Sequence, residues 1–124
     1  MTGNVRRGEI YWIDWSPSRG SEQRGRRPAL VIQNDIGNEF SPTTIVAALT
    51  TADIKPYPFI VPVTAKESGL AKDGLVNLAA IMTVDKSRLA DRCGTLNKEK
   101  MREVDNALKN SLAIDTDMFD IEQK

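Results

Sequence analysis

The sequence predicts a mainly β fold, a small barrel or strongly coiled sheet with one amphipathic helix packed on it near the C-terminus. Short runs rich in β-branched and aromatic residues recur along the chain, separated by Gly, Pro, Asn and Asp. Only residues 98–113 repeat apolar side chains at helical spacing over several turns. The 124 residues suit a single domain, in which we expect residues 1–6 and 115–124 to be loosely ordered.

The first two strands are predicted on either side of a long polar loop. Residues 9–15 are aromatic and β-branched, which is typical of a strand. Residues 16–27 form the loop, which is longer than a hairpin requires, and long loops in compact domains are often functional. Pro28 begins a second strand over residues 29–33, because proline is tolerated at the first position of a strand.

The middle of the chain predicts one central strand and one edge strand. Residues 34–43 are rich in turn formers and predict a loop. Residues 44–50 are almost continuously apolar, as expected for a central strand. Residues 59–63 include Pro62, which lacks a backbone N–H and therefore indicates an edge. Residues 65–70 are compatible with one helical turn.

The last third of the chain predicts further strands and the helix. Strands are expected over residues 75–78 and 81–84, with a weaker one over 90–96. Asn97 is a suitable N-cap for the helix. The apolar stripe of the helix, which we expect to pack on the core, consists of Met101, Val104, Leu108 and Leu112.

Composition excludes several kinds of chemistry. The chain has no histidine, so neither nucleases with paired imidazoles nor His-based triads are possible. The single cysteine, Cys93, allows no intramolecular disulfide and no Cys/His metal cluster, and we expect it to be structural. No tight carboxylate cluster suggests Mg²⁺, so we expect neither metal nor cofactor. We expect a cytoplasmic protein without membrane contact, since no signal peptide or spanning apolar run is evident.

Positive charge gathers near the start of the chain, although the formal net charge is zero. A local cationic face can bind phosphates while the rest of the molecule stays neutral. A solvated charged surface is the commoner explanation for such a run, and both interpretations stay open. The arginines concerned are Arg6, Arg7, Arg19, Arg24, Arg26 and Arg27.

The loop segment 20–28, Gly-Ser-Glu-Gln-Arg-Gly-Arg-Arg-Pro, has the composition of a phosphate-binding site. Glycine lets backbone N–H groups approach an anion closely. Arginine offers planar bidentate donors that match phosphate. The strand that follows would hold Arg27 more rigidly than the loop tip holds Arg24. On these grounds alone, a phosphate site is no better supported than an exposed hairpin tip.

The order of the motifs resembles the MazF/PemK/Kid toxins of type II toxin–antitoxin pairs, over roughly residues 6–113. An ordered match of this extent is far more specific than a lone short motif. The segments that carry it are Arg7-Gly8-Glu9-Ile10-Tyr11-Trp12, Gly20-Ser21-Glu22-Gln23, Gly25-Arg26-Arg27-Pro28, Leu30-Val31-Ile32-Gln33-Asn34-Asp35, Ser41-Pro42-Thr43, the strand from Ile45 to Ala48, Thr50, Thr83-Val84-Asp85-Lys86-Ser87-Arg88-Leu89 and the C-terminal helix.

The resemblance implies an SH3-like, CcdB/MazF-like barrel with short helices, a homodimer and a cognate MazE-like antitoxin. It also implies a metal-independent endoribonuclease that cleaves single-stranded mRNA at a short sequence, leaving a 2′,3′-cyclic phosphate and a 5′-hydroxyl. By their motif positions, Arg27 and Thr50 are expected to be catalytic, and Glu22 matches a glutamate near the scissile phosphate. The expected RNA-binding residues are Ser21, Gln23, Arg24 and Arg26.

These residues suit that chemistry, because RNA supplies its own nucleophile, the 2′-hydroxyl. The enzyme must provide in-line geometry, stabilise the charged phosphorane and manage protons. Arg27 suits the non-bridging oxygens but is a poor base, since a guanidinium is not deprotonated in proteins. Thr50 can donate a hydrogen bond to a phosphoryl oxygen. Glu22 is the candidate base, and its alternative role is to orient Arg27 by an ion pair.

Two features leave alternatives open. Ala80 and Met82 stand where many relatives carry a glutamine and an arginine, which puts the RNA sequence preference in doubt, and Arg24 is a candidate to compensate. A non-catalytic, gyrase-directed toxin like CcdB and a peptide-binding SH3-like module are competing functions. Glu22 and Arg27 together with Thr50 favour the ribonuclease, whereas fold alone decides nothing.

Overall fold

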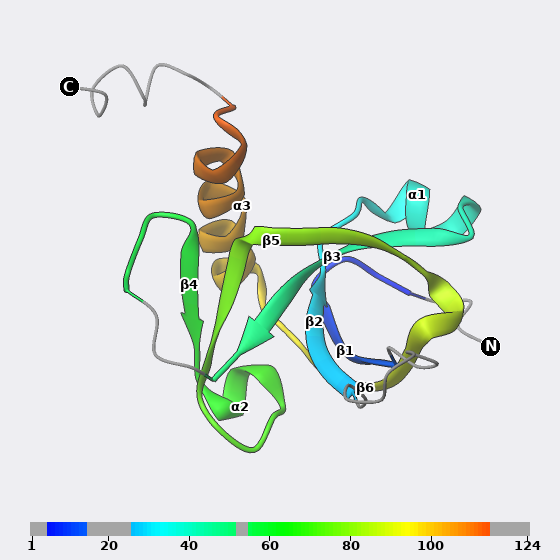
Figure 1. The fold of residues 1–124 in the computed structure, drawn as a ribbon, viewed down its shortest axis with the longest axis horizontal. Helices are drawn as coiled ribbons and strands as arrows, with labels where there is room; N and C mark the ends of the chain where they lie inside the picture. The colour runs from blue at the N-terminus through cyan, green and yellow to red at the C-terminus, as the bar shows by residue number, and fades with distance from the viewer. Residues whose placement is uncertain (1–4, 15–25, 52–54, 115–124) are drawn as a thin grey trace, which may run out of the picture.

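The computed structural model describes residues 5–14, 26–51 and 55–114. Within these residues, six strands form one antiparallel sheet in the order β4-β5-β3-β2-β1-β6 (Figure 1). The strands are β1 (Glu9–Asp14), β2 (Arg26–Val31), β3 (Thr43–Thr50), β4 (Ile60–Val63), β5 (Gly74–Asp85) and β6 (Leu89–Thr95). The helices are α1 (Asp35–Phe40), α2 (Ala65–Ser68) and α3 (Lys98–Leu112), and η1 (Lys86–Arg88) is a 3-10 turn.

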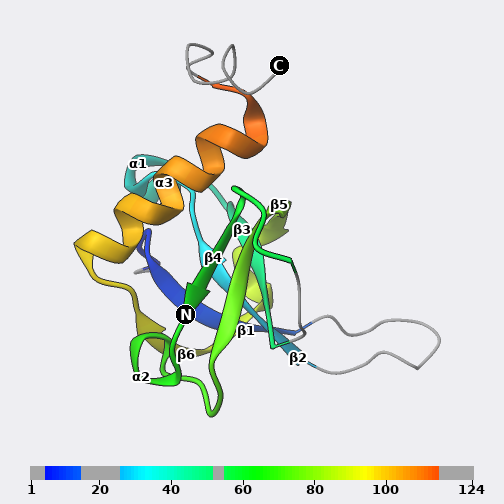
Figure 2. The same ribbon diagram turned by 90° about the vertical axis from the view of Figure 1, so that its left-hand side faces the viewer.

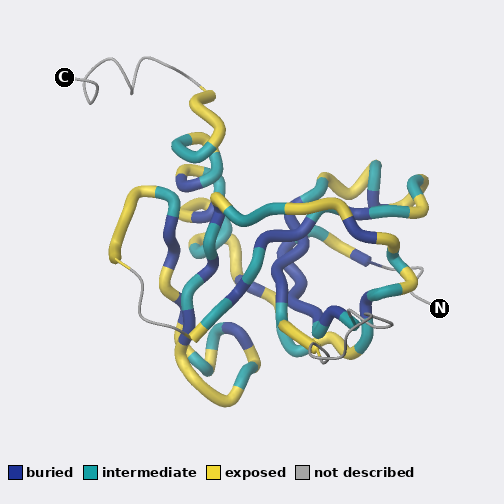
Figure 3. The backbone as a smooth tube through the Cα atoms, viewed as in Figure 1, coloured by how far each residue is buried: buried dark blue, intermediate teal, exposed yellow. Residues whose placement is uncertain are grey.

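The sheet curls strongly and buries a different core on each face. Val31 and Ile13 belong to the cluster inside the ring that β1, β2, β3, β5 and β6 form in the right half of Figure 1. Leu30 and Ile10, at positions of opposite parity on the same two strands, belong to a second cluster, because successive strand residues point to opposite faces. Helix α3 covers this second cluster, packing against β4 and β5 (Figure 2). Burial on both faces explains the dark blue stretches of β1 and β2 in Figure 3, whereas much of β5 is intermediate or exposed.

This arrangement confirms the predicted fold class, a small, mainly β, SH3-like barrel with a C-terminal amphipathic helix. Strand β3 lies in the interior of the sheet, as its apolar sequence predicts. Strand β4 lies at the edge, and its Pro62 is exposed. The side chain of Asn97 caps α3 by accepting a hydrogen bond from the Lys100 N–H at 2.8 Å. The predicted turn after residue 64 is the short helix α2.

Several predicted boundaries were wrong. β2 already begins at Arg26, so the loop prediction extended too far and Arg26 and Arg27 both belong to a strand. The two strands predicted over 75–78 and 81–84 are one long strand, β5, with an irregularity where it passes Ala47 and Ala48 of β3. Of residues 1–6, which we expected to be loosely ordered, residues 1–4 lie outside the described part of the chain, and Val5 is buried in the barrel core. Residues 115–124 lie outside the described part of the chain.

Helix α1 was not predicted, because residues 34–43 have the composition of a loop. Asn34 caps it by accepting the Gly37 N–H at 2.8 Å. Asn38 is fully buried, and its side chain donates to the Gln33 carbonyl and accepts the Thr44 hydroxyl at 2.6 Å. This helix therefore depends on a tertiary polar network that local sequence patterns do not reveal.

Candidate active site

A groove of about 800 Å³ lies at the ends of β2 and β3 and contains both described residues that were predicted to be catalytic, Arg27 and Thr50. Its floor includes Ala29 and Ala48, which face each other across the two strands. These small side chains leave space between the larger residues around them. The paired alanines therefore leave room for the groove between β2 and β3.

The strand register brings Arg27 and Thr50 together. Ala29 pairs with Ala48; Arg27 lies two positions before Ala29 on β2, and Thr50 lies two positions after Ala48 on β3. Extending the antiparallel register thus places Arg27 opposite Thr50, on the same face as the paired alanines. The residues are 23 positions apart in the sequence (50 − 27), and only the sheet makes them neighbours.

The described lining of the groove is cationic. Arg27 and Lys72 contribute positive charge, and no carboxylate occurs among the described residues that line it. Arg27 is exposed and makes no ion pair with any residue of segments 5–14, 26–51 and 55–114. Such a groove attracts an anion, and an arginine in it can bind phosphate oxygens with two parallel hydrogen bonds.

The wall contributed by β5 is apolar. Met82 pairs with Val46 of β3, lines the groove and is 40% exposed. Ala80 lies on the stretch of β5 between its pairs with Ala47 and Ala48. Trp12 also contributes to the groove, and an aromatic side chain there can stack on a base.

The remaining predicted site residues do not lie in the described groove. Glu22, Ser21, Gln23 and Arg24 are outside the described residues. Arg26 neighbours Arg27 on β2 and therefore points to the opposite face. Its guanidinium lies 3.3 Å from the Asp91 carboxylate, and both side chains are well exposed. A pair this exposed is weak and leaves the charge of Arg26 accessible.

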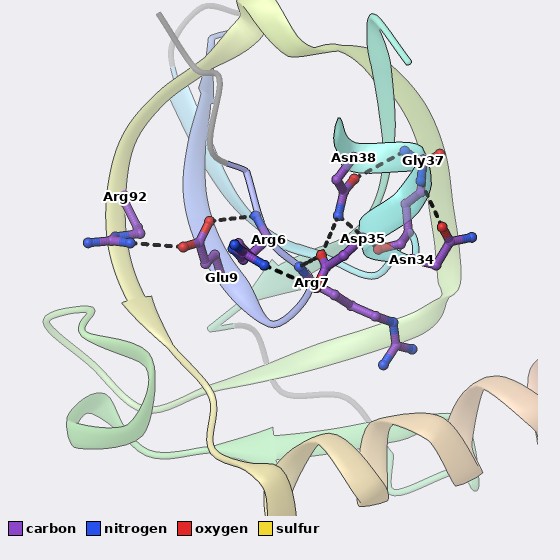
Figure 4. Close-up of polar contacts among 9 residues, drawn as sticks. Arg6, Arg7, Glu9, Asn34, Asp35, Gly37, Asn38 and Arg92 are labelled. Carbon is purple, nitrogen blue, oxygen red and sulfur yellow. Dashed lines mark hydrogen bonds and ion pairs between the residues drawn. The ribbon is translucent and has the colours of Figure 1, made fainter. Parts of the chain in front are cut away.

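One arginine of the predicted cationic face, Arg7, has a structural role (Figure 4). Arg7 donates from its backbone N–H to Asp35 at 2.7 Å, from Nε to the Ile32 carbonyl at 2.7 Å, and from Nη2 to Asp105 at 2.8 Å. The Arg6 guanidinium lies 3.9 Å from Asp35. These contacts hold the pKa of Asp35 below its usual value, chiefly through the hydrogen bond from the Arg7 backbone N–H. The cationic surface is therefore narrower than the sequence suggests.

A buried carboxylate, Glu9, also has a structural role. It accepts hydrogen bonds from the Arg6 backbone N–H at 2.8 Å, the Tyr11 hydroxyl at 3.0 Å and the Arg92 guanidinium at 2.8 Å. Burial raises the pKa of Tyr11 to about 12, with further contributions from the hydrogen bond and the charge of Glu9. Glu9 thus links β1 to Arg92 of β6 and to the segment before β1, and it does not line the groove.

Cys93 is half-buried on β6, which agrees with a structural role. Burial, together with the nearby charge of Asp91, raises the pKa of its thiol, so the reactive thiolate is disfavoured. Among the described residues, no three acidic or cysteine side chains converge on a point where a metal ion would bind. None of the described helices has the length and apolar character needed to cross a bilayer.

Comparison with known proteins identifies close relatives. The family of PemK-like, MazF-like toxins of type II toxin–antitoxin systems matches residues 6–112. The endoribonuclease EndoA of Bacillus subtilis is 51% identical over 111 residues, which cover 89% of this chain and 96% of EndoA. The endoribonuclease MazF of Staphylococcus epidermidis is 48% identical over 111 residues, covering 89% of this chain and 92% of that protein.

Solved structures agree with the sequence comparison. A mycobacterial endoribonuclease in complex with its cognate antitoxin superposes with a TM-score of 0.76 at 25% identity, covering 90% of this chain and 97% of the other. A MazE-MazF structure from Deinococcus radiodurans superposes with a TM-score of 0.74 at 28% identity, covering 89% and 96% of the two chains. The similarity therefore extends over the whole barrel and the helix.

Proposed function

This chain belongs to the family of PemK-like, MazF-like toxins of type II toxin–antitoxin systems, and from that premise we propose that it is an endoribonuclease toxin acting on single-stranded RNA. The main support for this proposal is that Arg27 and Thr50 line one groove, where the extended register of β2 and β3 places them opposite each other. Its described lining is positively charged and has no acidic side chain, which favours binding of a phosphodiester.

In the proposed reaction, the 2′-oxygen of one ribose attacks the adjacent phosphorus, and the bond from phosphorus to the 5′-oxygen of the next nucleotide breaks. A 2′,3′-cyclic phosphate and a 5′-hydroxyl result, so no water or metal-bound nucleophile takes part in this step. Arg27 binds the non-bridging oxygens as negative charge develops on them, and Thr50 donates a hydrogen bond to a phosphoryl oxygen. The departing 5′-oxygen takes up a proton from solvent water, which balances the proton that the 2′-hydroxyl gives to the base.

Glu22, which lies outside the described residues, is the proposed acceptor of the 2′-hydroxyl proton. If it is the base, the rate falls as pH drops and Glu22 becomes protonated. Replacement by glutamine should then lower kcat and remove the acidic limb of the pH–rate profile. An acidic limb that persists in Glu22→Gln would instead assign Glu22 to orienting Arg27 by an ion pair.

The partner of this toxin is proposed to be a MazE-like antitoxin with an acidic segment. Such a segment would compete with RNA for the positive charge of Arg27 in the groove. We further propose that the toxin is a homodimer and acts in the cytoplasm, where its mRNA substrate is translated. The gyrase-directed alternative is not favoured, because both of the sequence relatives described above are endoribonucleases.

A cleavage assay tests the proposal. Purified protein is incubated with a long single-stranded RNA in EDTA, beside Arg27→Ala and Thr50→Ala, and the new RNA ends are mapped. We expect cuts at a short recurring sequence with wild type and a loss of cleavage in both variants, each of which should remain folded because its side chain is not in the core. Cleavage at an undiminished rate by the folded Arg27→Ala protein would contradict the assigned site.

A further inference from the structure

Lys72 lies in the same groove as Arg27 and Thr50, yet the chemistry proposed above gives it no role. It is exposed and belongs to the turn between α2 and β5. Building on the proposed function, we propose that Lys72 is a second phosphate-binding residue. It binds a backbone phosphate next to the scissile one, on the side of Thr50 that faces β5.

The sheet places Thr50 between the two cations. β3 has β2 on one side and β5 on the other. The register of β2 brings Arg27 to one side of Thr50, whereas Thr50 pairs on its other side with Leu75, three residues after Lys72. The start of β5 packs closely here, since a Cβ added to Gly74 would lie 2.8 Å from the Thr50 carbonyl oxygen. An RNA backbone that passes Thr50 therefore has the positive charge of Arg27 on one side and that of Lys72 on the other.

The turn that carries Lys72 is fixed before any ligand arrives. On one side, the Asp73 carboxylate accepts the Ala65 N–H at 2.8 Å. On the other, the Leu70 N–H donates to the Ser68 hydroxyl at 3.1 Å, and Gly69 packs directly on the Cys93 carbonyl. Because the backbone of the turn is already ordered, phosphate binding by Lys72 does not carry the entropic cost of ordering a loop.

The charge of Lys72 is available to a ligand. Lys72 makes no ion pair with any residue in the described part of the chain. The neighbouring Asp73 uses its carboxylate to hold α2, and it does not line the groove. An ammonium group is a compact charge that suits a phosphate contact without a fixed hydrogen-bond geometry. Lys72 should therefore add affinity for the RNA backbone without reading the bases.

The test compares Lys72→Gln with Lys66→Gln, which removes the same charge from an exposed position on α2 outside the described lining of the groove. Binding is measured by fluorescence anisotropy over a salt series, with a labelled single-stranded DNA of random sequence that has phosphates but no 2′-hydroxyl. We expect Lys72→Gln to bind roughly fivefold more weakly at low salt. The slope of log K against log salt should shrink by about 0.7, the value for one phosphate of a single strand.

Cleavage kinetics and a rescue variant complete the design. Lys72→Gln should raise the KM for RNA and leave kcat unchanged, Lys66→Gln should match wild type, and Lys72→Arg should restore the wild-type salt slope. Equal affinity and equal salt slope in wild type and Lys72→Gln would overturn the inference. A wild type that binds the DNA but cleaves no RNA would instead overturn the proposed function, and the binding measurement would still decide the role of Lys72.

Discussion

Met82 gives the groove an apolar side chain where the resemblance to the toxin family implies an arginine. It lines the wall opposite Val46 and offers no hydrogen-bonding group to a base. Apolar contact discriminates weakly between bases, because every base presents a flat face to it. We therefore infer that one nucleotide beside the cut is recognised loosely.

Introducing a polar group at position 82 should make cleavage more selective for the RNA sequence around the cut. In Met82→Arg, base frequencies at one position near the cut should become more uneven, because a guanidinium can donate two hydrogen bonds to guanine. The cut sites are compared by sequencing the ends of a random RNA pool. Met82→Leu is the matched control and should leave the frequencies unchanged. Identical frequencies for wild type and Met82→Arg would show that no base contacts residue 82.

The buried Tyr11 hydroxyl makes the free energy of unfolding fall as the pH rises above 10. Its pKa is raised from 10.0 to about 12, so the folded state keeps the proton that the unfolded state loses. This stabilisation is fully present below pH 10 and disappears as the pH rises toward 12. Tyr11→Phe should cost about 1 kcal/mol at neutral pH through the lost hydrogen bond to Glu9. Urea unfolding across this pH range should therefore show a steeper decline for wild type than for Tyr11→Phe, and parallel curves would contradict the assignment.

At the scale of elements, the contact between α2 and β6 sets the position of the turn that carries Lys72. Gly69 ends α2 with φ +83°, a conformation that side chains rarely adopt. A Cβ at this position would collide with the Cys93 carbonyl, and a Cβ at Gly94 would lie 2.5 Å from the Ser68 carbonyl. Two glycines thus allow two backbones to touch, and this contact supports one end of the turn.

Alanine substitutions at Gly8 and Gly69 distinguish the cost of backbone strain from the cost of a steric collision. Gly8 also has a positive φ, +99°, but a Cβ there would be 3.7 Å from the nearest side-chain atom. Gly8→Ala should therefore cost only the conformational strain, about 1 kcal/mol. Gly69→Ala should cost at least about twice as much, since the backbones must also separate. Urea midpoints measure both, and equal losses would mean that β6 yields easily to the added methyl group.

The sequence predicts elements well where local pattern and burial coincide, as in β3 and α3. It fails for α1, because the buried contacts of Asn38 with Gln33 and Thr44 form only once the sheet exists. The same limit applies to the site. Arg27 and Thr50 could be predicted from a motif, whereas Lys72 is a single lysine in an ordinary turn. Only the register of β3 and β5 brings it to the groove.

At the scale of the whole molecule, apolar side chains remain exposed at the far end of α3. Tyr57, Leu112 and Ile114 are each about half exposed, and Asn110 ties α3 to the segment before β4 by donating to the Pro58 carbonyl at 3.4 Å. Exposed apolar residues that gather on one surface are typical of an interface. We expect this end of α3 to lie in the proposed homodimer interface.

A charge placed in this surface should dissociate the dimer. Leu112→Glu is compared with Ile36→Glu, which makes the same kind of change at an exposed apolar residue of α1. Light scattering during gel filtration should give the dimer mass for wild type and Ile36→Glu, and the monomer mass for Leu112→Glu. A monomeric Ile36→Glu beside a dimeric Leu112→Glu would place the interface on α1 instead.

We propose that the groove holding Arg27 and Thr50 cleaves RNA through the RNA's own 2′-hydroxyl. The most direct measurement uses a short RNA with one mapped cut site and a matched strand with a single 2′-deoxyribose on the 5′ side of that cut, both in EDTA. We predict that the RNA is cut to a 2′,3′-cyclic phosphate and a 5′-hydroxyl, and that the substituted strand binds equally well but stays intact. Cleavage of the substituted strand, or a 5′-phosphate on the product, would contradict the account.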